Sequence, residues 1–290
     1  MKGFLSPKDC DPRVFGWTAP HYLSLNGRVL AAGRLCLIFP GTGGLPRDYR
    51  KLADQAADLG LHALVLRYPN DVSINELAGG DLSLHEPLRR TVWDGCARAG
   101  IPPLAPGECV RDRLLAVLLE AARTRPEEGW GQFLSEGDLL WERVVAVGHS
   151  LGGGYAALLA MDHSLERVVV MGWADWDRSV GRLASWIEKP WATGEDSRFC
   201  LIHKRDEMVT GSVGREVARV FCPASTVAEV ESDEPPYGHA RILVSDLDPA
   251  REYPTASPFH NSLAVDVEIP RFWDGANMLS DAWTWLLIGR

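Results

Sequence analysis

The sequence predicts an α/β domain with a mostly parallel central sheet flanked by helices, and two observations carry this prediction. Short apolar runs, typical of strands buried on both faces, alternate along the chain with segments of helical spacing. The chain of 290 residues with 46% hydrophobic content is long enough to bury one large core. Since no internal repeat, low-complexity segment or linker interrupts it, we expect a single domain over residues 1–290.

The expected elements alternate between strand and helix. Apolar runs predict buried strands at residues 35–39, 62–66, 143–147, 167–171, 198–202 and 240–244. Apolar side chains at helical spacing predict helices over residues 47–59, 111–123, 151–161, 212–221 and 281–288. Residues 71–107 and 173–197 are longer, cap-like insertions. In a parallel sheet such insertions lie over the carboxyl ends of the strands, where ligands bind.

The bulk properties argue against several function classes. The net charge of −9, with no basic stripe, argues against a nucleic acid partner. No run of about 18 apolar residues is present, so we expect no membrane span. The six cysteines form no C-x-x-C pair, and we therefore expect neither a disulfide scaffold nor a metal site. The first residues lack the apolar core of a signal peptide, which favours a cytoplasmic protein. The sequence leaves the oligomeric state open.

The apolar run at residues 144–147 leads into Gly148-His149-Ser150-Leu151-Gly152, which is typical of a nucleophile elbow. A serine hydroxyl is a poor nucleophile unless it is held exposed beside a base, and a sharp turn from strand to helix exposes it. Glycines flank the serine because a Cβ there would crowd the turn. The sequence therefore predicts Ser150 as a nucleophile.

A nucleophilic serine needs a carboxylate that orients its base, and in this arrangement the acid follows the serine at the end of a later strand. Asp206 lies four residues beyond the strand expected at 198–202. Asp175, after the preceding strand, is the competing candidate, and Glu207 is a weaker one. We favour Asp206 because a loop carboxylate there can meet a histidine from the next loop.

Two of the eight histidines are candidates for the base, since both follow the acid in the chain. His239 precedes the strand expected at 240–244 and would enter the sheet at its amino end, away from the catalytic edge. His260 lies in the loop after that strand and emerges on the same side as Ser150. We therefore favour His260 and keep His239 as the alternative.

Two backbone N–H groups must stabilise the oxyanion that forms when the serine attacks a carbonyl. Leu151, directly after the nucleophile, supplies one of them. The other is expected from the glycine-rich loop at residues 39–44, with Thr42 as the favoured donor and Gly43 as the alternative. Removing one such donor typically costs about 3 kcal/mol of transition-state stabilisation.

These three segments together resemble the α/β-hydrolase superfamily of serine esterases, lipases and thioesterases. The loop at 39–44 resembles the oxyanion loop of esterases, with Pro40 where a histidine is common, and residues 203–209 are similar to the acid-bearing loop. The resemblance covers about residues 34–290. It implies cleavage of esters, thioesters or amides through an acyl-enzyme without a cofactor, although some members catalyse lyase or transfer reactions and others have lost activity.

Aromatic residues suggest where a small-molecule substrate would bind. Trp173, Trp176, Trp186 and Trp191 fall in the insertion at 173–197 and either line a substrate pocket or pack the insertion onto the domain. We assign Trp173 and Trp176 to the pocket, together with Gly43. Basic residues of the same insertion either meet an anionic substrate or face water: Arg178, Arg182 and Lys189.

The expected function is hydrolysis of an ester or thioester of a small or medium organic acid by a Ser-His-Asp triad. A competing hypothesis is an NADP-binding oxidoreductase, because Gly41 and Gly43 follow a strand and Arg67 ends the next one, where it would meet a 2′-phosphate. Pro46 replaces the third glycine of that fingerprint. The sequence also leaves open a non-hydrolytic reaction on the same fold, such as lyase or acyl-transfer chemistry, and ligand binding without turnover.

Overall fold

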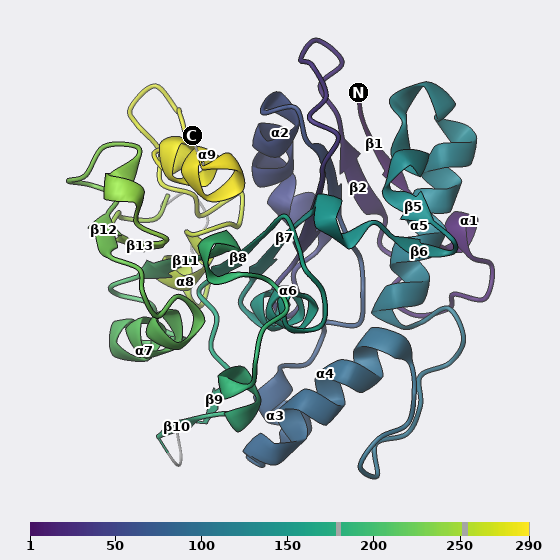
Figure 1. Cartoon of the computed structure of the whole chain (residues 1–290), viewed down its shortest axis with the longest axis horizontal. Helices are drawn as coiled ribbons and strands as arrows, with labels where there is room; N and C mark the ends of the chain where they lie inside the picture. Colours follow the sequence, from purple (N-terminus) through teal and green to yellow (C-terminus); the bar gives the residue numbers. More distant parts are fainter. Residues whose placement is uncertain (178–180, 251–254, 290) are drawn as a thin grey trace.

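A nine-stranded sheet forms the centre of the part of the chain that the structure describes (Figure 1). The structure is a computed structural model and describes residues 1–177, 181–250 and 255–289. The strand order is β1-β2-β4-β3-β7-β8-β11-β13-β12. The bounds, in chain order, are β1 (Lys2–Leu5), β2 (His21–Ser24), β3 (Leu35–Phe39), β4 (His62–Val65), β7 (Val144–His149), β8 (Arg167–Met171), β11 (Arg198–His203), β12 (Val227–Glu229) and β13 (Ile242–Ser245).

Most of this sheet is parallel. The strands from β4 across to β12 all pair in parallel, and only β1 with β2 and β2 with β4 pair antiparallel at one edge. Helical crossovers connect the parallel strands, which places helices on both faces. The predicted fold class, an α/β fold with a mostly parallel central sheet flanked by helices, is confirmed.

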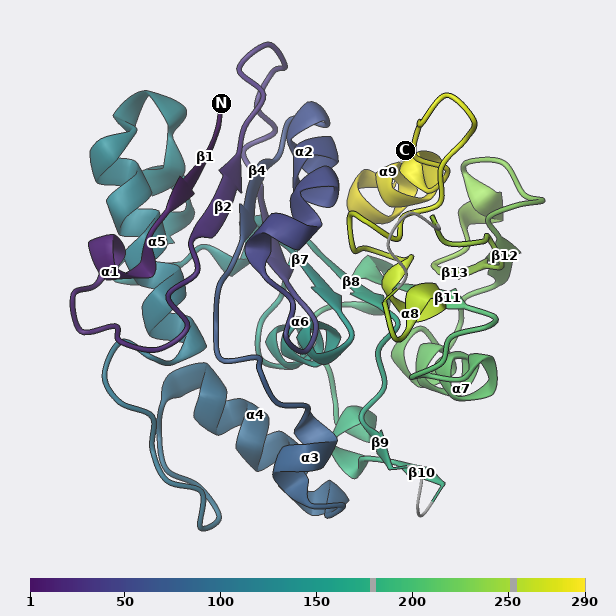
Figure 2. The same cartoon turned by 180° about the vertical axis from the view of Figure 1, so that it is seen from behind.

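Helices cover both faces of the sheet (Figures 1 and 2). One face carries α2 (Arg50–Asp58) and α9 (Ser280–Ile288), which also contact each other. The opposite face carries α5 (Val110–Thr124), α6 (Leu151–Asp162) and α7 (Gly211–Phe221). The short helices are α1 (Pro7–Cys10), α3 (Ile74–Ala78) and α8 (Pro258–Asn261), and α4 (His85–Asp94) is longer. Two small hairpins complete the elements, β5 (Leu134–Ser135) with β6 (Asp138–Leu139) and β9 (Trp176–Asp177) with β10 (Arg182–Leu183).

The alternation of side chains along each strand divides the interior into two cores. In β3, Leu35, Leu37 and Phe39 pack toward α5 and α6, whereas Cys36 and Ile38 pack toward α2 and α9. All five side chains are buried, because both faces of a parallel sheet are covered. This explains why the sequence shows the strand as one continuous apolar run.

The predicted elements match the observed ones within a few residues, and the differences have local causes. The helix expected at 47–59 begins with a 3₁₀ turn over Pro46–Tyr49 before α2. The edge strands β1 and β12, and β2 next to β1, were not predicted, because they are short and carry polar residues among their apolar ones. No helix in the described ranges is both long and apolar enough to cross a membrane.

The two long insertions lie beside each other. The insertion at 71–107 contains α3 and α4, and the insertion at 173–197 contains the hairpin of β9 and β10. The Asn75 side chain donates a hydrogen bond of 2.9 Å to the carbonyl of Trp176, and Lys189 forms an ion pair with Glu86. Contacts between the insertions therefore fix their relative positions.

Candidate active site

Ser150 occupies the sharp turn between β7 and α6. Its backbone angles are φ 54° and ψ −122°, a strained conformation that a non-glycine residue rarely adopts. A Cβ on Gly148 would lie 2.1 Å from the carbonyl oxygen of Gly152, and a Cβ on Gly152 would lie 2.1 Å from that of Phe39. Only glycine fits at these two positions. The local geometry is that of a nucleophile elbow.

His260 and Asp206 lie against each other although 54 residues separate them in the chain. Nδ1 of His260 is 2.8 Å from Oδ2 of Asp206, and both side chains are buried. The other carboxylate oxygen, Oδ1, accepts the N–H groups of Met208 and Val209 at 2.8 and 2.7 Å. A carboxylate only accepts, so Nδ1 carries the proton and Nε2 presents a lone pair.

The free nitrogen of His260 belongs to the same pocket as Ser150. Nε2 is buried and has no hydrogen-bond partner among the described residues, and both residues line one cavity. Gly172 leaves the space for this ring, since a Cβ there would lie 3.2 Å from Nδ1 and Cε1 of His260. A buried lone pair without a donor is suited to take a proton from a hydroxyl in this pocket.

The backbone of His260 is held as firmly as its ring. The carboxylate of Glu207 accepts the N–H groups of Phe259 and His260 at 3.1 and 2.9 Å. Nε2 of His149 is 3.0 Å from the carbonyl oxygen of His260. Glu207, the weaker acid candidate, therefore contacts the backbone of the histidine, while its neighbour Asp206 contacts the ring.

The competing base lies elsewhere. His239 is exposed on a 3₁₀ turn just before β13, and its ring packs against Trp285 at a centroid distance of 5.8 Å. This position is at the amino end of β13, whereas Asp206 follows the carboxyl end of β11. The geometry therefore favours His260 over His239.

The competing acid is fully engaged with other partners. Asp175 is buried and forms a bidentate ion pair with Arg89, whose Nε lies 2.8 Å from its Oδ2. The indole N–H groups of Trp173 and Trp186 also donate to this carboxylate, at 3.2 and 2.8 Å. Burial alone would raise the pKa of Asp175, but the Arg89 guanidinium outweighs burial and lowers that pKa well below its usual range. Asp175 therefore remains ionised and structural.

In the glycine-rich loop after β3, the backbone N–H groups differ in whether they have an acceptor in the described structure. The N–H of Gly41 donates to Tyr49 Oη at 2.9 Å, and that of Gly43 donates to the carbonyl of Asn70 at 2.7 Å. The N–H of Thr42 finds no acceptor among the described residues. Leu151 is the first residue of α6, where a backbone N–H lacks an acceptor within the helix. Of the two loop candidates, the geometry favours Thr42 over Gly43.

Side chains from the segment that follows β4 hold this loop in place. Asn70 donates from Nδ2 to the carbonyl oxygens of Gly41 and Gly44 at 2.7 and 2.9 Å. Tyr68 donates to the carbonyl of Pro40 at 2.5 Å. Arg67 is buried and binds the side chains of Asn70 and Asp71. Its guanidinium thus orients the side chain that supports the loop, which does not favour the phosphate contact of an NADP-binding oxidoreductase.

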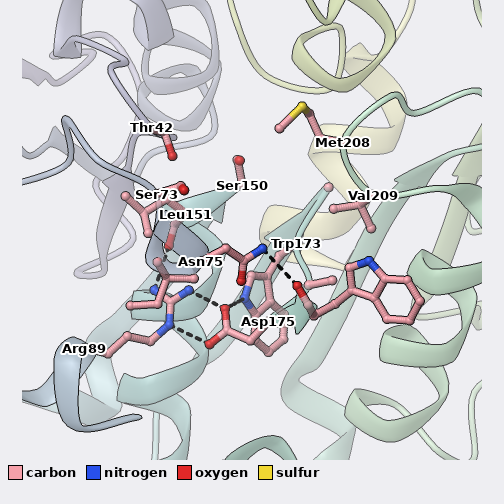
Figure 3. A pocket seen from close by; sticks show the side chains of 14 residues that line it. Thr42, Ser73, Asn75, Arg89, Ser150, Leu151, Trp173, Asp175, Met208 and Val209 are labelled. Carbon is pink, nitrogen blue, oxygen red and sulfur yellow. Dashed lines mark hydrogen bonds and ion pairs between the residues drawn. The ribbon is translucent and has the colours of Figure 1, made fainter. Parts of the chain in front are cut away.

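Two cavities meet at Ser150, and Thr42, Ser150 and Met208 line both of them. The smaller has a volume of about 120 Å³ and lies between the two insertions and the elbow (Figure 3). The larger has a volume of about 350 Å³ and contains His260. Besides the shared residues, the smaller is lined by Ser73, Ile74, Asn75, Arg89, Leu151, Gly172, Trp173, Ala174, Asp175, Trp176 and Val209. The larger is lined by Gly41, Gly43, Gly44, Asp48, Tyr49, His149, Thr255, Ala256, Ser257, His260, Asn261 and Val265.

The residues assigned to the pocket from sequence divide between these cavities. Trp173 and Trp176 line the smaller one, with the Arg89–Asp175 pair beneath Ser150 in Figure 3, and Gly43 lines the larger one. Trp173 also packs against Trp186, so its ring contributes to both the pocket wall and the packing of the insertion. Among the basic residues, Lys189 pairs with Glu86, Arg182 is exposed, and Arg178 lies outside the described residues.

Sequence reasoning missed the residues that hold the site together. Tyr49 and Asn70 support the loop, His149 and Glu207 fix the backbone of His260, and Arg89 lies beneath the elbow. Tyr49 and His149 are 100 residues apart in the chain. Local patterns predict burial for such residues but do not reveal a partner at that separation.

Comparison with known proteins finds no match in sequence, and the three solved structures named below are distantly similar. No family model matches the chain, and no curated protein matches it in sequence. A crystal structure of a putative dienelactone hydrolase from Klebsiella pneumoniae is similar at 12% identity and a TM-score of 0.43, covering 85% of each chain. TT1662 from Thermus thermophilus has 16% identity and a TM-score of 0.40, covering 85% of this chain and 88% of that one.

A third solved structure is XC6422 from Xanthomonas campestris, described as a member of the a/b serine hydrolases without a lid. It has 12% identity and a TM-score of 0.40, and the match covers 85% of this chain and 84% of that one. Similarity at this distance transfers neither an activity nor a site residue. The function must therefore be argued from the residues of this chain.

Proposed function

We propose that this protein is a serine hydrolase that cleaves an ester or thioester of a small organic acid through an acyl-enzyme. One observation carries the proposal. The ring of His260 is held by Asp206 at 2.8 Å, its buried Nε2 has no hydrogen-bond partner within the described part of the chain, and His260 lines the same cavity as Ser150. A nucleophile, a base and an acid that orients the base are the elements of acyl-transfer catalysis.

The mechanism follows from these positions. Ser150 Oγ attacks the carbonyl carbon of the substrate while Nε2 of His260 takes the hydroxyl proton. The carbonyl oxygen becomes an oxyanion, and the N–H groups of Thr42 and Leu151 stabilise its charge. Asp206 stabilises the imidazolium, which returns its proton to the leaving group as the acyl-enzyme forms. Water, deprotonated by His260, then attacks the acyl carbon and releases the acid and Ser150.

The two cavities suggest how the substrate is oriented. His260 lines only the larger cavity, and it must protonate the leaving group, so the leaving group occupies the cavity of about 350 Å³. The acyl group then occupies the cavity of about 120 Å³ next to Leu151. An apolar cavity of roughly 150 Å³ holds a six-carbon ring, so the volume of this smaller site matches an acyl group of about five heavy atoms.

Labelling with a fluorophosphonate probe tests the nucleophile directly. Wild-type protein is expected to gain one adduct on Ser150, and Ser150→Ala is expected to lose labelling and turnover while keeping its circular dichroism spectrum. Ser257→Ala is the matched control, since this hydroxyl lines the larger cavity but lies outside the elbow. Wild-type protein that neither labels nor hydrolyses any ester would instead support a protein that binds without turnover.

A series of p-nitrophenyl and acyl-thioester substrates tests the size of the acyl site. We expect kcat/KM to be greatest for acyl chains of two to about five heavy atoms and to fall for longer chains, because the smaller cavity has a volume of only about 120 Å³. Mass analysis of the product distinguishes hydrolysis from acyl transfer, since only hydrolysis in labelled water introduces ¹⁸O into the acid. Equal rates for short and long chains would contradict this orientation.

A further inference from the structure

A chain of hydrogen bonds runs from the glycine-rich loop to the backbone of His260. The N–H of Gly41 donates to Tyr49 Oη at 2.9 Å, Tyr49 Oη is 2.9 Å from Nδ1 of His149, and Nε2 of His149 is 3.0 Å from the carbonyl oxygen of His260. Tyr49 and His149 are buried, at 1% and 2% exposure. The mechanism proposed above uses neither side chain.

The protons in this series of hydrogen bonds can be placed in only one consistent arrangement. Burial, with a smaller contribution from neighbouring His260, lowers the pKa of His149 to about 3, so its ring is neutral at pH 7 and carries one proton. That proton must be on Nε2, because Nε2 faces a carbonyl oxygen, which only accepts. Nδ1 is then an acceptor, and it receives the hydroxyl proton of Tyr49. Tyr49 Oη in turn accepts from Gly41.

This series of hydrogen bonds connects the glycine-rich loop, which carries the Thr42 N–H, to His260. Both parts of the proposed catalytic machinery must be correctly placed relative to Ser150. The loop carrying Gly41 and Thr42 is packed directly on the elbow, because a Cβ on Gly41 would lie 3.0 Å from Cβ of Ser150 and 3.1 Å from Nδ1 of His149. The peptide that ends at Gly41 precedes the one that carries the free N–H of Thr42. At the other end, the carbonyl held by His149 belongs to His260 itself.

We propose that Tyr49 and His149 are positioning residues that hold the Thr42 N–H and the His260 ring at the correct positions relative to Ser150. This inference rests on the proposed function. The hydroxyl of Tyr49 and the two ring nitrogens of His149 then act on the rate of the chemical step. Both residues line the larger cavity, but their polar atoms bind each other, Gly41 and His260, and neither residue lines the cavity assigned to the acyl group.

Replacing Tyr49 with phenylalanine removes the hydroxyl and keeps the ring. We expect kcat for p-nitrophenyl acetate to fall about 10- to 100-fold, since displacements of about 1 Å have effects of this size, with KM nearly unchanged. Tyr22→Phe is the matched control, because its hydroxyl binds Asp54 at 2.7 Å on the far edge of the sheet. An unchanged kcat in folded Tyr49→Phe would overturn the inference.

Two variants of His149 distinguish hydrogen bonding from packing. Gln keeps an N–H group that can donate to the carbonyl of His260, whereas Phe keeps a planar ring but neither donor nor acceptor. We expect kcat to decrease in the order wild type, His149→Gln, His149→Phe. The reverse order, with Phe the more active variant, would show that the ring is only packed and would overturn the role of His149.

The outcomes separate this inference from the proposed function. If wild-type protein fails to label with the fluorophosphonate probe and fails to hydrolyse the ester, the proposed function is wrong. If wild-type protein is active and Tyr49→Phe labels Ser150 at the same rate, only the positioning role is wrong. Because Tyr49→Phe leaves a buried N–H without an acceptor, urea unfolding is measured alongside to show that the variant is folded under the assay conditions.

Discussion

Asp206 and Asp175 follow neighbouring parallel strands, β11 and β8, yet their surroundings differ completely. Both are buried, at 5% and 0% exposure. Asp175 binds Arg89 and two indole N–H groups, so its charge is matched by a permanent cation. Asp206 binds two backbone N–H groups and the ring of His260, which gains charge only by taking a proton.

The hydrogen-bond partner separates a structural acid from a catalytic candidate. Burial and position at a strand end are the same for both, so neither property distinguishes them. The partner does. A guanidinium is always protonated and cannot act as a base at neutral pH, whereas an imidazole held by a carboxylate can accept a proton and release it again.

The largest effect is expected for Asp206→Asn. Met208 and Val209 donate to Oδ1, so the amide oxygen will stay there and the amide NH₂ will face His260 Nδ1. Nδ1 must then accept, which moves the ring proton to Nε2, where it blocks base catalysis. We expect kcat to fall by about 10⁴-fold, measured with p-nitrophenyl acetate. A variant that retains more than about a tenth of the activity would contradict the assignment.

A smaller effect, on stability rather than catalysis, is expected for Asp175→Asn. This substitution leaves the charge of Arg89 buried without a counterion, which typically costs about 3–5 kcal/mol. The free energy of unfolding in urea measures this loss, and Asp206→Asn provides the comparison. If Asp175→Asn were as stable as wild type but inactive, and Asp206→Asn fully active, the roles of the two acids would be reversed.

A third effect, which is small at neutral pH and grows as the pH falls, concerns His149, the buried histidine beside His260. The pKa of His149 is lowered by burial to about 3 in the folded state, against 6.5 for an exposed histidine. A lowered pKa stabilises the fold above pH 6.5, and this stability is lost as pH falls from 6.5 toward 3, at about 1.4 kcal/mol per pH unit.

The comparison of wild type with His149→Gln isolates this contribution. Other groups titrate in both proteins, so the difference between their urea unfolding curves at about pH 7.5, 6, 5 and 4 reports on His149. We expect the stability of the variant to fall less steeply with decreasing pH. Parallel slopes would mean that His149 does not remain neutral in the folded state.

Much of the fold could be predicted because its signals are local. The central strands are buried on both faces, so β3 and β7 appear as unbroken apolar runs. The elbow could be predicted for the same reason, since its glycines and Ser150 are close neighbours in the chain. Strand β2 could not be predicted, because only tertiary contacts bury its polar residues His21 and Ser24.

The site was partly predictable from topology. The order of strands indicated that Asp206 and His260 would emerge at the same edge of the sheet, and the structure brings them together. The roles of Glu207 and Asp175 were not predictable in this way. Asp206 and Glu207 are adjacent carboxylates that look alike in sequence. Only the folded chain decides that Asp206 binds the ring of His260 and Glu207 binds its backbone.

The sequence by itself determined the parallel sheet, the strained turn at Ser150 and the order in which acid and histidine follow it, because each depends on near neighbours or on strand order. Tertiary structure alone decided which loop N–H stays free, which acid receives the guanidinium of Arg89, and that Tyr49 and His149 join the loop to His260. The physical reason is that hydrogen-bond partners of buried polar groups are chosen by proximity in space, and these partners lie up to 111 residues apart.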